Sequence, residues 1–277
     1  NYSNPNTGAT RGVIGDLIFQ VGADGEYSVN NWVISETGGA VGDGLLVYES
    51  FDYTSGANLS GQSGGTGWSG GWSGGGSVGS GLTFSDYVVA GGSAYFSGTQ
   101  TASRDLGVSV AEGQTMWTSY LVDDDRGWNE YSSSFGVRFV DDSTGSTKFG
   151  SWGKVYNSPN KGIQVDSSIT QVGGNLQNGP TYLVISKFTN IGTGSQVGKM
   201  WVLSTSDYDA IKSGGITEAE LDATNSGTAS ESVSSVIGVS AGDTLQLLYQ
   251  NSIGRYDELK IATSLDAVLG QDTSTPP

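Results

Sequence analysis

From residue 45 onward, short runs of apolar residues alternate with polar ones at a period of two, and Gly, Asp or Asn separates the runs. Successive side chains of a β-strand point to opposite faces, so this period predicts strands. We expect strands over residues 45–53, 82–90, 93–97, 115–122, 134–140, 148–155, 162–165, 182–189, 199–204, 233–239, 244–250 and 256–263. Strands at this spacing predict an all-β, two-sheet antiparallel sandwich.

Two of these runs alternate clearly enough to assign faces. In residues 115–122, one face carries Met116, Thr118, Tyr120 and Val122, and the other carries Trp117 and Leu121. In residues 134–140, Phe135, Val137 and Phe139 alternate with Gly136 and Arg138. One face of each sheet is therefore expected to form the core, and the other to meet solvent or a partner.

Turn and helix signals punctuate the strands. Residues 141–145, Asp-Asp-Ser-Thr-Gly, predict a hairpin turn, because Asp binds its own backbone and Gly tolerates positive φ. Between residues 206 and 225, Ser206 with Asp209 and Thr217 with Glu220 have the spacing of capping boxes. Two short helical turns are expected there.

Both ends of this strand-rich region resemble one known family. Residues 49–74 include Gly-Trp-Ser-Gly-Gly-Trp-Ser-Gly, and residues 255–263 read Arg-Tyr-Asp-Glu-Leu-Lys-Ile-Ala-Thr. These segments resemble the opening and the last strand of concanavalin A-like (LamG-like) jelly-roll domains in secreted and surface proteins of planctomycete and verrucomicrobial bacteria. The resemblance implies a jelly-roll sandwich over residues 45–270 and a secreted or cell-surface location. It does not imply one function, because one fold carries many activities.

Residues 1–44 are predicted to form an N-terminal β arm that such a sandwich does not require, and residues 271–277 are predicted to be a polar tail. The arm has apolar runs at residues 13–21 and 27–34, which predict a hairpin or two strands. An apolar arm of two strands needs a surface to pack on, either its own sandwich or a neighbouring copy. Packing on a neighbour would build a homopolymer. The residues that would carry such assembly are Val13, Ile14, Leu17, Ile18, Phe19, Val21, Val29, Trp32 and Ile34.

Composition and charge exclude several function classes. The chain has 12 basic and 28 acidic residues, a net charge of −16, which repels nucleic acid and anionic membranes. No apolar run approaches the roughly 20 residues of a membrane helix, so no membrane insertion is expected. The start at Asn1 fits either removal of an export signal or an excised fragment.

The sequence contains few of the residue types that catalytic sites use, since it has neither His nor Cys. Without His or Cys, no Ser-His-Asp triad, Cys-His pair or thiolate metal site can form. The nearest approach to a glycosidase carboxylate motif is residues 220–225, where Glu220 and Asp222 are followed by Asn225. That segment is better interpreted as a capped surface helix, so no enzymatic activity is expected.

Binding chemistry is better represented. Trp68, Trp72 and Trp128 are candidates for stacking on sugar rings, and the alternative for Trp68 and Trp72 is packing at the end of the sandwich. Asp123, Asp125, Asp52 and Asp257 are candidate calcium ligands. The alternatives are a solvated acidic turn near Asp123 and a structural role for Asp52 and Asp257 where the first and last strands meet. Asn1 and Asn58 begin N-glycosylation sequons.

These observations favour a non-enzymatic extracellular structural protein, a fibre or surface-layer subunit that assembles through its arm. The alternative is a carbohydrate-binding or adhesion module of LamG-like type that uses polysaccharide as its partner and calcium as its only candidate cofactor. The arm favours the first hypothesis, and the tryptophans favour the second.

Overall fold

The computed structural model describes residues 44–124, 133–172, 179–224, 228–234 and 236–270. The chain divides into two compact units, Asn1–Gly39 and Ala40–Pro277, and the described residues all belong to the second. The predicted arm, apart from Gly44, and the tail at residues 271–277 lie outside the described residues.

The described residues form a two-layer antiparallel β-sandwich of the jelly-roll type, in which all the strand pairs are antiparallel. One layer contains β12 (Ala229–Val233), β11 (Gln196–Leu203), β10 (Tyr182–Thr189), β5 (Met116–Asp124) and β1 (Leu45–Glu49). The other contains β9 (Ser168–Val172), β8 (Lys161–Val165), β7 (Thr147–Lys154), β6 (Ser134–Val140) and β4 (Gly92–Leu106), with β2 (Trp68–Gly74) and β3 (Ser77–Ser80) beyond β4.

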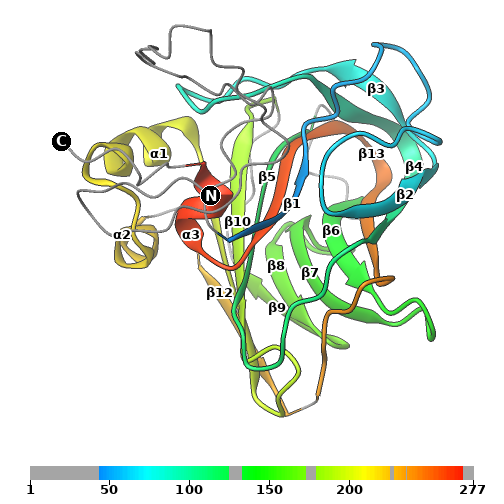
Figure 1. Ribbon diagram of the computed structural model, residues 1–277. Coiled ribbons are helices and arrows are strands. Elements are labelled where there is room, and N and C mark those ends of the chain that lie inside the picture. Colours follow the sequence, from blue (N-terminus) through cyan, green and yellow to red (C-terminus); the bar gives the residue numbers. More distant parts are fainter. Residues whose placement is uncertain (1–43, 125–132, 173–178, 225–227, 235, 271–277) are drawn as a thin grey trace, which may run out of the picture. The chain divides into compact units, whose positions relative to one another are not determined.

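The two layers share one long strand, β13 (Thr244–Ala262). Its first part, Thr244 to Gln250, lies between β4 and β6, and its last part pairs with β5 and β1. The register with β4 shifts between Tyr249 and Ser252, where Asn251 has a φ of 52°. Such a bulge lets a strand bend from one layer into the next. Figure 1 shows β13 passing from the side of β6 to that of β5 and β1.

The core lies between the layers, where the alternation in the sequence places the apolar side chains. Met116, Tyr120 and Val122 from β5 meet the layer of β6, whose Phe135, Val137 and Phe139 point inward as predicted. The rings of Phe149 in β7 and Phe188 in β10 lie 4.9 Å apart between centroids. The predicted assignment of faces is therefore confirmed for both strands.

The other face of β5, β10 and β11 is covered rather than open, which corrects the expectation of solvent or a partner there. Trp117 and Leu121 pack in a second apolar cluster. The cover consists of α1 (Thr205–Ile211), the 3₁₀ turn η1 (Lys212–Gly214), α2 (Glu218–Ala223), α3 (Leu265–Leu269) and the segment 82–89. Figure 1 shows these helices on the side of β10 opposite β6 to β9.

The helices α1 and α2 begin at capping boxes, only one of which was predicted with the correct residues. Thr217 and Glu220 cap α2 as predicted. The cap of α1 is Ser204 with Asp207, so the predicted pair of Ser206 and Asp209 is wrong by two residues. None of the helices in the described ranges is long and apolar enough to span a membrane.

Most predicted strands are confirmed, and residues 134–140 and 182–189 match β6 and β10 at both ends. Residues 82–90 form a loop instead of the predicted strand. The backbone amides at the two ends of this loop bind side chains rather than a neighbouring strand, since Leu82 N donates to Asp257 and Ala90 N donates to Glu258. The predicted strand at residues 233–239 is also wrong, because the observed strand β12 lies before it and ends at Val233. The predictions missed β2, β3 and β9, whose short Gly-, Ser- or Thr-containing runs have little apolar alternation.

A buried ion pair fastens the glycine-rich segment 61–75 to the sandwich. Arg104 Nη1 lies 2.6 Å from Glu49 Oε2, and both side chains are almost fully buried. Arg104 also donates to the carbonyls of Gly64 and Gly70. Glu49 accepts from Trp72 Nε1 at 3.0 Å, so one carboxylate joins β1, β2 and β4.

Replacing Glu49 by Gln should lower the free energy of unfolding by about 3 to 5 kcal/mol, because it leaves a buried guanidinium without its counter-charge. Urea denaturation followed by tryptophan fluorescence measures this change. The matched control is Asp86→Asn, which removes a partner from the exposed pair with Lys212 and should leave the midpoint unchanged. Equal midpoints for Glu49→Gln and wild type would contradict the role of this ion pair.

Candidate functional site

An open groove lies on the outer face of the layer that contains β4, β13, β6 and β7. Its cavity volume is about 380 Å³. The described residues that line it are Thr99, Thr101, Ser134, Arg138, Trp152, Val155, Tyr156, Ile169, Leu248, Tyr249 and Gln250. Most are hydroxyl, amide or aromatic residues, and the described helices cover the other layer rather than this face.

Trp152 lies on a floor of glycines. It stands opposite Gly136 of β6 and Gly162 of β8 in the strand register. A Cβ on Gly136 would lie 2.9 Å from the indole ring, and one on Gly150 would lie 3.2 Å from Trp152 Nε1. Larger residues would therefore displace the ring. The glycines let the indole lie close against the strands, and the side chain is half-buried.

Hydrogen bonds fix the orientation of the indole. Trp152 Nε1 donates to Gln164 Oε1 at 3.0 Å, and Gln164 Nε2 donates to the Asp166 carbonyl at 2.8 Å. Tyr156, in the turn between β7 and β8, also lines the groove and is 48% exposed. Exposed aromatic rings on a rigid sheet are a common way to bind a ligand that has an apolar face.

Arg138 projects from β6 next to the indole. A Cβ on Gly150 would lie 3.4 Å from Arg138 Cβ, so Arg138 and Trp152 flank the same glycine. Arg138 Nε donates to Gln246 Oε1 at 2.8 Å, and Nη1 lies 3.5 Å from Thr147 Oγ1. Burial lowers the pKa of the guanidinium below its ordinary value. Both of these partners are neutral.

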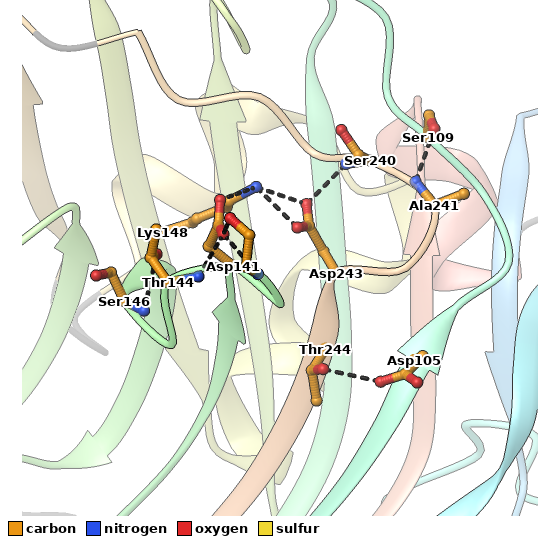
Figure 2. Close-up of polar contacts among 11 residues, drawn as sticks. Asp105, Ser109, Asp141, Thr144, Ser146, Lys148, Ser240, Ala241, Asp243 and Thr244 are labelled. Carbon is orange, nitrogen blue, oxygen red and sulfur yellow. Dashed lines mark hydrogen bonds and ion pairs between the residues drawn. The ribbon is translucent and has the colours of Figure 1, made fainter.

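Lys148, on the same face of β7 as Trp152, differs from Arg138 because carboxylates balance its charge. Figure 2 shows its ammonium group between Asp141 and Asp243, and Nζ lies 3.1 Å from Asp141 Oδ2 and 2.8 Å from Asp243 Oδ1. Burial alone would lower the pKa of Lys148, but the hydrogen bonds to the two carboxylates raise it above its ordinary value. This cluster ties the turn 141–145, a hairpin as predicted, to the start of β13.

Two of the tryptophans proposed for sugar contact, Trp68 and Trp72, are not among the described residues that line this groove. Trp72 is 2% exposed, its Nε1 binds Glu49, and its ring lies 5.7 Å from that of Phe51. It has no face free to stack on a sugar and serves packing, which corrects its assignment as a binding residue. Trp68 is half-buried, and the Arg104 guanidinium lies 5.0 Å from its ring centroid.

The described candidate calcium ligands do not form one group, and two of them bind other groups of the protein. Asp123 is buried and paired with Arg255. Asp257 is buried and accepts from the amides of Leu82 and Glu258, each at 2.8 Å, which fits its structural alternative. Asp52 is exposed. The described residues contain no group of three or more carboxylates that could hold a metal ion, so the predicted calcium set is not assembled there.

Of the remaining residues singled out in the sequence, Asn58 and Glu220 are described by the structure, and several others are not. Asn58 is exposed, and Glu220 caps the surface helix α2. Trp128, Asp125, Asn1 and the assembly residues of the arm lie outside the described residues. The fibre hypothesis rests on that arm and stays a prediction.

The sequence predictions missed Trp152, Tyr156 and Gln250, which line the groove. One signal was available, because Lys148, Gly150 and Trp152 alternate with the inward-facing Phe149 in a predicted strand. A tryptophan on the outward positions of a strand, flanked by glycines, indicates a ring laid on a sheet surface. The partners of that ring could be identified only from the register of the strands.

No family model and no curated protein matches the sequence. Among solved structures, the chain is similar to an endo-β-1,4-glucuronan lyase from the fungus Trichoderma reesei, at 12% identity over 79% of this chain and 98% of that one, with a TM-score of 0.45. It is similar to domain 4 of AbnA, a GH43 extracellular arabinanase from Geobacillus stearothermophilus solved with arabinotriose, at 15% identity over 82% and 98%, with a TM-score of 0.46.

A third similar structure is the exoplasmic/lumenal domain of VIP36 in a Ca²⁺/Man2-bound form, at 8% identity over 76% of this chain and 88% of that one, with a TM-score of 0.44. At this level of similarity, none of the three identifies a ligand for this chain. The bacterial groups named by the sequence resemblance stay a prediction.

Asp257 should make stability depend on pH. Burial raises the pKa of its carboxyl from 3.8 to about 8, against the hydrogen bond from Leu82, and the Glu258 carboxylate adds to the rise. Between these values the folded chain holds a proton that the unfolded chain has lost, so raising the pH favours unfolding. The free-energy difference between wild type and Asp257→Asn should therefore shift by up to about 1.4 kcal/mol per pH unit between about pH 4 and 8.

Urea denaturation of both proteins across this range measures the shift. The wild type should lose stability relative to the variant as the pH rises. Parallel curves for the two proteins would show that Asp257 ionises normally in the fold.

Proposed function

We propose that this protein is a non-catalytic carbohydrate-binding module and that a polysaccharide segment lies in the groove on the outer face of β4, β13, β6 and β7. The observation that carries the proposal is the half-buried indole of Trp152, set against Gly136 and Gly150 and fixed by Gln164. The indole is a flat apolar platform among polar groups, and it is held in place before any ligand arrives.

A sugar ring suits this arrangement because it has an apolar face of C–H groups and an edge of hydroxyl groups. The face can stack on Trp152 or Tyr156, and the edge can exchange hydrogen bonds with neighbouring polar side chains. Ser134 Oγ and Gln250 Oε1 are 3.1 Å apart on one side of the groove, and Thr99 and Thr101 line it from β4. Binding sites commonly combine apolar walls with a few polar groups that fix orientation.

The size of the groove fits a few sugar units. Its volume of about 380 Å³ lies within the roughly 300 to 1,000 Å³ of small-ligand sites. Its floor is made by strands rather than loops, so the geometry changes little on binding. These features favour recognition of a short stretch of a longer chain.

Binding without hydrolysis is the activity that the lining supports. Most glycosidases place two carboxylates across the scissile bond. The described residues that line the groove include neither Asp nor Glu. We therefore infer a binding role, in keeping with the carbohydrate-binding hypothesis drawn from the sequence.

Replacing Trp152 by Ala should weaken polysaccharide binding about 30-fold or more, because truncation of an aromatic anchor costs about 2 kcal/mol or more. Replacing the more exposed Tyr156 by Ala should weaken it to a smaller extent. Affinity gel electrophoresis against a panel of soluble polysaccharides measures both effects with the full chain.

The control is Trp68→Ala, which removes a tryptophan from outside the groove. Thermal melting of each variant checks that the fold is kept. Loss of binding in Trp68→Ala with full retention in Trp152→Ala would place the binding surface elsewhere and overturn the proposal.

Binding in this groove should not require calcium. Its described lining offers no carboxylate, and calcium needs about six to eight oxygen ligands. Retention of polysaccharide in the presence of EDTA should equal retention with added Ca²⁺. A complete loss of binding in EDTA that calcium restores would contradict the assignment of the site.

A further inference from the structure

Arg138 has neutral hydrogen-bond partners among the described residues, whereas most of the other described cations pair with carboxylates. Arg104, Lys148 and Arg255 pair with Glu49, Asp243 and Asp123 respectively. Lys187, Lys199, Lys212 and Lys260 also have carboxylate partners. The contacts of Arg138 are with Gln246 and Thr147, and none of the ion pairs among the described residues includes it.

Arg138 is also the only charged residue in the described lining of the groove. It is half-buried, and burial disfavours its charged form. A guanidinium has five N–H donors in a planar fork that matches two oxygens of one anionic group. Gln246 and Thr147 occupy part of the fork. An anion at this point would supply the charge that burial leaves without compensation.

Arg138 and Trp152 line the same groove, which indicates that the anion would be a substituent of a sugar ring stacked on the indole. Arg138, Trp152 and Gln164 converge on Gly150, where an added Cβ would lie 3.4, 3.2 and 3.4 Å from them. The Arg138 atom at that point is Cβ, and the guanidinium is held by Gln246 and Thr147. Because Arg138 and Trp152 line the same groove, an acidic sugar stacked on Trp152 would carry its anionic substituent in the groove that holds the guanidinium.

We propose that the groove selects acidic polysaccharide and that Arg138 binds the anionic group of a sugar unit stacked on Trp152. The inference rests on the proposed carbohydrate-binding function and specifies its ligand class. A uronate carboxylate and a sulfate ester share the required chemistry, two or more oxygens with negative charge. The experiment separates these two sources.

The charge of the whole chain argues against loose attraction of polyanions. With a net charge of −16, the protein repels an acidic polymer at long range. Binding must then come from local contacts at Arg138. Salt screens the repulsion between exposed charges strongly. It screens the attraction between a half-buried guanidinium and a bound anion less. Affinity for the acidic polymer should therefore hold or rise between about 20 and 150 mM salt.

The test measures the affinity of the full chain for two matched pairs of soluble polymers, each pair having one acidic and one neutral member. These are polygalacturonate, the same polymer after reduction of its carboxyl groups, and dextran sulfate beside unmodified dextran. We expect polygalacturonate or dextran sulfate to bind at least tenfold more tightly than its neutral counterpart. The preferred acidic polymer identifies carboxylate or sulfate as the natural group.

The variants are Arg138→Gln, Arg138→Lys and, as a matched control outside the groove, Lys212→Gln. Arg138→Gln should lose at least tenfold in affinity for the acidic polymer and keep its affinity for the neutral one. Arg138→Lys should retain part of the preference, and Lys212→Gln should match wild type. Thermal melting confirms folding, and Arg138→Lys serves as the test if Arg138→Gln does not fold.

Two outcomes separate this inference from the function it rests on. Equal affinity for acidic and neutral polymers, or equal losses for both in Arg138→Gln, would overturn the acidic selectivity and leave carbohydrate binding in place. No binding to any polysaccharide in a broad panel would overturn the proposed function itself.

Discussion

The whole sandwich depends on one strand that belongs to both layers. The first part of β13 lies between β4 and β6, and its last part pairs with β5 and β1. The bulge at Asn251 lets the strand change layers without giving up its pairing along most of its length. Because β13 supplies Leu248 and Gln250 to the groove, the strand that joins the layers also positions part of the candidate site.

The two outer faces of the sandwich differ in what covers them: helices cover one, and the other carries the groove. On the layer of β5, β10 and β11, helices and the segment 82–89 bury the outward apolar residues, such as Trp117 and Leu121. On the other layer, the outward residues are small, polar or aromatic, and the groove remains open. This asymmetry, with Trp152 laid on glycines and Arg138 beside it, makes the open layer the better candidate for recognition.

Sequence patterns predicted the sandwich well because strand alternation is local. Phe135, Val137 and Phe139 alternate within five consecutive residues, and all three reach the core. The loop at residues 82–90 was predicted wrongly because its amides bind Asp257 and Glu258, which are distant in sequence. The groove likewise depends on the register that brings Gly136 opposite Trp152 and Gln246 opposite Arg138. The motif at residues 67–74 instead predicted Trp68 and Trp72 as binding residues, although Trp72 is buried in the core.

The most direct test of the account is a crystal structure of the full chain with a bound acidic oligosaccharide, an oligogalacturonate or a sulfated counterpart according to which polymer binds. The account predicts a sugar ring stacked on the Trp152 indole, with its anionic group within hydrogen-bond distance of the Arg138 guanidinium. An oligosaccharide bound at another surface, with the groove of Trp152 and Arg138 empty, would contradict it.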